Sequence, residues 1–95
     1  MAGAGALDRE IEALRRELEA RRRALGELRA AKHDEDHQAR RLGDAMERHG
    51  GRQVEAESRL SLLDEGRRLT AKAIAKTERQ IAELERRLAA LGKAP

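Results

Sequence analysis

The sequence predicts an all-α fold, an antiparallel two-helix coiled-coil hairpin that associates with a second copy into a four-helix bundle. In both halves of the chain, apolar residues recur at alternating spacings of three and four residues, which is the pattern of a coiled-coil seam. The only glycine doublet of the sequence, Gly50-Gly51, stands between the two halves. Together these observations predict a chain that folds back on itself near its middle.

The composition favours long helices packed along a narrow seam. Charged residues make up 41% of the 95 residues, and Phe, Trp, Tyr and Cys are absent. Without cysteine, neither a disulfide framework nor a Cys-ligated zinc site can form. No apolar run approaches the roughly 20 residues of a membrane span, and no apolar export signal follows Met1. We therefore expect a cytoplasmic protein that does not associate with membranes.

The first helix is expected over residues 7–48, after a disordered tail over residues 1–6. Arg48 and His49 suit its C-terminal end, where the helix dipole is negative. Its seam consists of Leu7, Ile11, Leu14, Leu18, Leu25, Leu28, Ala39, Leu42 and Met46, with Arg21, Lys32 and Glu35 at the intervening seam positions.

The turn is expected at residues 49–51, because glycine accepts the left-handed backbone conformation that commonly ends a helix. The second helix follows over residues 52–91, with Glu55 and Glu57 near its positive N-terminal end. The hairpin thus covers residues 7–92, and a short tail follows over residues 93–95. The second seam consists of Ala56, Leu60, Leu63, Ile74, Ile81, Leu84, Leu88 and Leu91, with Gln53, Arg67, Thr70 and Thr77 between them.

The alignment of the two helices is predicted from their seams and from the charges beside them. The apolar seams match when Leu14 faces Leu84, and this alignment also sets Glu35 opposite Leu63. On one flank it pairs Arg15 with Glu85 and Arg22 with Glu78, and on the seam it sets Lys32 opposite Arg67. Exposed pairs of this kind help to determine the alignment more than the stability.

A second apolar stripe predicts self-association. Leu62 and Leu69 fall beside the seam, on the same side as Gly66 and Ala73, and Ala24 and Ala31 turn toward that side from the first helix. Small residues allow another helix to approach closely, and a two-helix hairpin buries little surface on its own. We expect a homodimer or binding to a helical protein partner through these residues. The alternative is that both leucines are ordinary exposed residues.

One cluster suggests a divalent transition metal as cofactor. His33 and His37 lie one turn apart, and the predicted alignment places Asp36 opposite Asp64. Two imidazoles and two carboxylates are ligands of the kind that bind such ions. The alternative is a solvated charge cluster, in which His33 or Arg40 offsets the carboxylates.

Basic residues recur every seven positions on the outer face of each predicted helix, and the net charge is +3. A phosphate backbone or an acidic surface could be attracted to them. The lack of aromatic residues argues against base stacking. The alternative is the ordinary charged exterior of a coiled coil. The residues are Arg9, Arg16 and Arg23 on the first helix and Lys72, Arg79 and Arg86 on the second.

The sequence therefore predicts a non-enzymatic scaffold or adaptor that acts by helix–helix recognition. Ser58 and Ser61 lack neighbours that would activate a nucleophile, and no phosphate-binding loop motif follows the glycine doublet. We expect no small-molecule substrate. A basic arm that binds nucleic acid and a metal-responsive hairpin are the two alternative functions.

Overall fold

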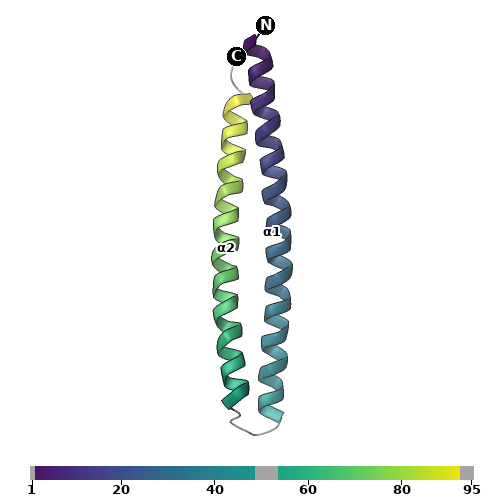
Figure 1. Ribbon diagram of the computed structural model, residues 1–95, viewed down its shortest axis with the longest axis vertical. Helices are drawn as coiled ribbons and strands as arrows, with labels where there is room; N and C mark the ends of the chain where they lie inside the picture. Colours follow the sequence, from purple (N-terminus) through teal and green to yellow (C-terminus); the bar gives the residue numbers. More distant parts are fainter. Residues whose placement is uncertain (1, 49–53, 93–95) are drawn as a thin grey trace. The chain divides into compact units, whose positions relative to one another are not determined.

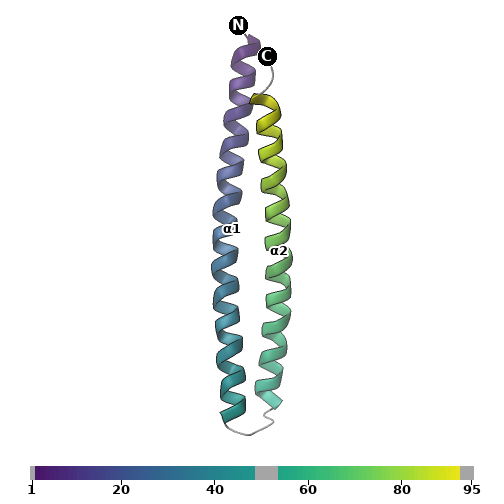
Figure 2. The ribbon, with the colours of Figure 1, turned by 180° about the vertical axis from the view of Figure 1, so that it is seen from behind.

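The computed structural model describes residues 2–48 and 54–92, the first three of these as backbone only. The chain forms two helices, α1 (Ala2–Arg48) and α2 (Val54–Gly92), which pack against each other as a hairpin (Figures 1 and 2). The predicted all-α class is therefore confirmed. Neither helix is both long and apolar enough to span a membrane.

The helix boundaries differ most from the prediction at the start of α1. The sequence predicts a disordered tail over residues 1–6, but α1 begins at Ala2, so residues 2–6 are helical. Alanine has the highest helix propensity, and the Arg9 Nε donates a hydrogen bond to the Gly5 carbonyl at 3.2 Å. The end of α1 at Arg48 agrees with the prediction, whereas α2 is shifted slightly toward the C-terminus. The predicted turn at 49–51 and tail at 93–95 lie outside the described residues.

The chain divides into two compact units, and both helices contribute to each. Unit 1 contains α1 as far as Gly26 and α2 from Ala75 onward. Unit 2 contains α1 from Glu27 and α2 as far as Ile74. Within each unit the segments of α1 and α2 run in opposite directions (Figure 1).

Unit 1 contains the apolar core. Leu14, Leu18 and Leu84 are buried, and Leu84 is only 4% exposed. Packed against these three are Ile81, Leu88 and Leu91. Burying a leucine side chain contributes about 1.5–3 kcal/mol, so this cluster is the main apolar contribution to unit 1.

Unit 2 has smaller and more polar seam residues. Its buried apolar residues are Ala39 and Ala56, and Glu35, Arg67 and Thr70 are half-buried beside them. The predicted seam residue Lys32 is exposed, because a long aliphatic stem lets the ammonium group reach water. Burial of apolar surface consequently contributes less stability per residue in unit 2 than in unit 1.

The alignment of α1 and α2 differs from the predicted one. Arg22 Nη2 lies 3.5 Å from Glu85 Oε2, where the predicted partner of Glu85 was Arg15. The Glu35 carboxylate lies 2.7 Å from the Thr70 hydroxyl. A seam side chain packs between several residues of the facing helix rather than against one counterpart. This alignment also gives Glu35 a hydrogen-bonding partner in place of the apolar Leu63, which lowers the cost of burying its charge.

Candidate functional site

Two large apolar side chains stand exposed on α2 in unit 2. Leu62 is 73% exposed and Leu69 is 58% exposed, and they are separated by two helical turns. Gly66 and Ala73, which share their stripe, are half-buried. We call these four residues the α2 face. Of the two α1 alanines predicted to support it, Ala31 is exposed and Ala24, which belongs to unit 1, is half-buried.

An open groove of about 340 Å³ adjoins Leu62 in unit 2. Leu42 of α1 lines it, a residue that the sequence pattern had assigned to the seam alone. Gly66 keeps the groove open at its α2 side, since a Cβ atom there would lie 3.3 Å from Glu35 Oε2. The groove can therefore receive an apolar side chain. Its lining residues are Glu35, Gln38, Leu42, Arg59, Leu62, Leu63 and Gly66.

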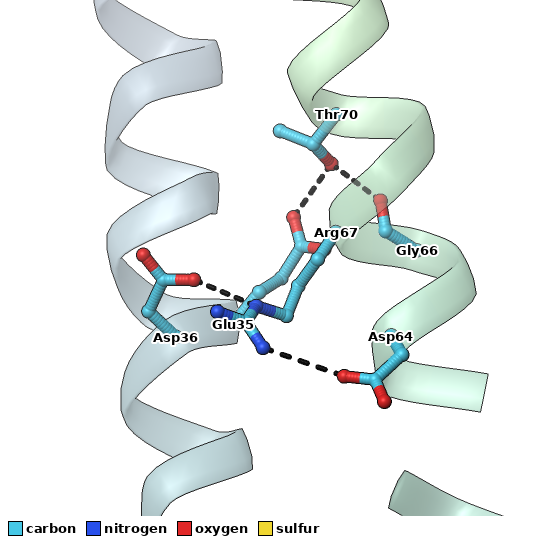
Figure 3. A network of polar contacts seen from close by, with 6 residues as sticks. All are labelled: Glu35, Asp36, Asp64, Gly66, Arg67 and Thr70. Carbon is cyan, nitrogen blue, oxygen red and sulfur yellow. Dashed lines mark hydrogen bonds and ion pairs between the residues drawn. The ribbon is translucent and has the colours of Figure 1, made fainter. Parts of the chain in front are cut away.

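A polar network lies beside this groove, with Arg67 at its centre (Figure 3). Arg67 Nε lies 2.7 Å from Asp36 Oδ1 on α1, and Arg67 Nη1 lies 3.3 Å from Asp64 Oδ1 on α2. The hydrogen bond and charge of Asp36 raise the pKa of Arg67 above its ordinary value, with a smaller contribution from Asp64. One guanidinium thus links the two helices and separates two carboxylates.

The second half of the network is centred on Thr70. Its hydroxyl lies 2.7 Å from Glu35 Oε1 and 2.9 Å from the Gly66 carbonyl oxygen (Figure 3). A hydroxyl has one proton to donate, and an ionised carboxylate is the stronger acceptor. Thr70 therefore orients the Glu35 carboxylate at the edge of the groove.

The residues proposed for a metal site are only partly brought together. Asp36 and Asp64 bind the same guanidinium, whereas His33 and His37 are exposed. In the described parts of α1 and α2, no group of three or more His, Cys, Asp or Glu side chains is arranged to hold a metal ion. The sequence analysis places Arg67 on the seam and does not predict that it binds these carboxylates. The available signal was its position three residues after Asp64, a spacing at which opposite charges on one helix can pair.

The predicted basic stripes are partly neutralised by neighbours on the same helix. Arg16 Nη2 lies 3.6 Å from Glu12 Oε1, and Arg86 Nη2 lies 2.6 Å from Glu83 Oε2. The hydrogen bond from Arg86, followed by its charge, holds the pKa of Glu83 below its ordinary value. Arg23, Lys72 and Arg79 are exposed.

Comparison with known proteins does not assign the chain to a family. No family model matches the chain, and no curated protein and no solved structure matches it.

Proposed function

We propose that this protein is a non-enzymatic scaffold or adaptor that self-associates through the α2 face. Two hairpins pair in a dimer, and the paired helices form a four-helix coiled-coil bundle over part of their length. The observation that carries this proposal is the exposure of Leu62 and Leu69, at 73% and 58%, on one stripe of α2.

The groove beside Leu62 supports a second copy as the occupant. Leu42 and Leu63 give it an apolar lining, and Gly66 adds no side chain to it. Burial of each leucine contributes about 1.5–3 kcal/mol, and twofold symmetry doubles every contact. Leu62 or Leu69 of one copy is of the right size and chemistry to enter the groove of the other.

The small core gives a physical reason for association. Few apolar residues are buried among those described, and two of them are alanines. A domain this thin gains stability when a second copy covers its exposed apolar surface. The buried apolar residues are Leu14, Leu18, Leu25, Ala39, Ala56 and Leu84.

The test is the mass in solution of the intact chain and of Leu69→Glu, measured by sedimentation across protein concentration. We expect the wild type to be a dimer at high concentration, because the α2 face is then covered. Leu69→Glu should be a monomer of unchanged helicity, since burying an unpaired carboxylate is costly whereas an exposed helix position tolerates Glu.

Val54→Glu is the matched control. Val54 is 76% exposed at the start of α2 but does not belong to the α2 face. A carboxylate there is favoured by the helix dipole, so this variant should dimerise like the wild type. A wild type that is monomeric at all concentrations, or a Leu69→Glu variant with the wild-type mass, would reject the proposal.

A further inference from the structure

Half of the residues that line a groove in unit 1 are cationic. The groove has a volume of about 340 Å³ and lies between α1 and α2, and the buried Leu84 is one of its lining residues. Arg21 comes from α1, and Lys76, Arg79 and Arg87 come from α2. We call these four residues the cationic groove. The other lining residues are Glu17, Gln80 and Glu83.

The positive charge of this groove is only partly neutralised by the residues that line it, because four cations accompany two carboxylates, Glu17 and Glu83. Within residues 2–48 and 54–92, Arg21, Lys76 and Arg79 form no ion pair. Glu83 is already bound by Arg86, and Arg87 contributes to holding its charge. The groove therefore carries an excess of cations over available carboxylates.

Arg21 provides a second, independent indication. It occupies a seam position between the buried Leu18 and Leu25, and its side chain is half-buried. A charged residue at a seam position stabilises the hairpin less than an apolar residue at the same place, unless a partner offsets its charge. A bound anion would supply the missing partner.

We propose that the cationic groove binds the phosphate backbone of a nucleic acid without sequence preference. Lys76 and Arg87 are separated by about 16 Å along α2, at ~1.5 Å per residue, so the groove can follow several phosphates of one strand. An acidic helix would need exposed apolar residues to pack against, and none of the large apolar residues that stand exposed, Val54, Leu62 and Leu69, lines this groove. The chain also has no aromatic residue on which bases could stack, which restricts contact to the backbone.

This inference differs from the sequence prediction in the residues that it uses. Arg16 and Arg86 of the predicted stripes are engaged by Glu12 and Glu83, whereas Arg21, Lys76 and Arg87 were not among the predicted contacts. The groove shares no residue with the α2 face, so Leu69→Glu should still bind nucleic acid.

The test is fluorescence anisotropy of a labelled DNA duplex of about 20 base pairs, titrated with the full chain at several salt concentrations. Because the charge of Arg87 already interacts with Glu83, three phosphate contacts are expected, by Arg21, Lys76 and Arg79. They predict a slope of about −2.7 in the logarithm of affinity against the logarithm of salt. The affinity should accordingly fall about forty-fold between ~50 and ~200 mM salt. The combined variant Arg21→Gln, Lys76→Gln and Arg79→Gln should lose most of this slope.

The matched control removes equal charge from cations that are already paired. Arg16→Gln, Arg22→Gln and Arg68→Gln each break an ion pair whose carboxylate does not line the groove, and together they should keep the wild-type slope. If the groove variant loses helicity, the exposed pair Lys76→Gln and Arg79→Gln is measured instead and should lower the slope by about two.

Three results would overturn the proposal. The first is no anisotropy change with wild type at low salt. The second is an equal loss of binding in the control and groove variants, which would indicate net charge alone. The third is displacement of the duplex by polyglutamate as effective as that by unlabelled duplex, which would identify an acidic polypeptide as the partner.

Discussion

Arg67 makes an acidic pair tolerable in unit 2. Asp36 and Asp64 come from different helices, and both lie within ion-pair distance of the same guanidinium. A planar guanidinium presents several donors at fixed angles, so it can serve two carboxylates at once in a way that an ammonium group cannot. The same residue supplies the positive charge that a bound cation would otherwise provide.

Replacing Arg67 with methionine should lower the stability of the hairpin, and the loss should be larger at low salt. Methionine keeps much of the aliphatic contact but leaves Asp36 and Asp64 without their shared partner. Salt screens the remaining repulsion, since the screening length falls from about 10 Å at ~0.1 M to about 3 Å at ~1 M. Thermal unfolding followed by circular dichroism measures the difference.

The control for this substitution is Arg67→Met combined with Asp64→Asn. Removing one carboxylate abolishes the repulsion, so the double variant should recover part of the lost stability at low salt. A difference between Arg67→Met and the wild type that stays constant from low salt to about 0.5 M would contradict the electrostatic explanation.

At the scale of the helices, the interior glycines limit stability where they make no contact. A Cβ atom at Gly26 or Gly43 of α1 would meet nothing within 4 Å. Alanine is more favourable than glycine in a helix interior by about 0.8–1.0 kcal/mol, largely because glycine loses more conformational freedom on folding. These two positions therefore reduce stability without an evident packing benefit.

Gly26→Ala and Gly43→Ala should each stabilise the hairpin by about 0.5–1 kcal/mol. Urea unfolding followed by circular dichroism gives the free energy of unfolding. Gly66→Ala is the informative comparison, because its Cβ would lie 3.3 Å from Glu35 Oε2 and the carboxylate would have to move. We expect a smaller gain there, and an equal gain at all three positions would argue against the contact as the cause.

The two helices were predictable, but their alignment was not. The spacing of Leu14, Leu18, Leu84 and their neighbours identified α1, α2 and the core of unit 1. Because both seams repeat with the same period, a shift along the helix axis exchanges one set of apolar contacts for a similar one. The actual alignment brings Glu35 to Thr70, which side-chain geometry determines and periodicity does not.

The candidate sites were predictable to different degrees. Exposure of Leu62 and Leu69 follows from their place beside the seam, since only seam positions point toward the facing helix. The cationic groove required the structure, because Arg21 had been assigned to the seam and the groove joins it to residues far along the chain. Charge gave no signal for the early start of α1, because its first turn contains no acidic residue that would favour the positive end of the helix dipole.

At the scale of the whole molecule, the two units differ in how they are stabilised. Unit 1 buries Leu14, Leu18 and Leu84, whereas the buried apolar residues of unit 2 are Ala39 and Ala56. Larger apolar side chains gain more on burial, at about 25 cal/mol per Å². Unit 2 also presents the exposed α2 face, so covering that face by a second copy would stabilise the weaker unit.

Amide hydrogen exchange should therefore be slower in unit 1 than in unit 2 when the protein is monomeric. Local opening is easier where fewer apolar contacts must be broken, so the amide of Leu84 should be better protected than that of Leu63. The measurement is made on Leu69→Glu, in which the α2 face cannot pair.

In concentrated wild type, dimer formation should raise protection around Leu63 and leave Leu84 nearly unchanged, because binding stabilises the region it covers. Equal protection of both amides in Leu69→Glu would contradict the difference in core strength, and protection around Leu63 that is independent of wild-type concentration would contradict pairing through the α2 face.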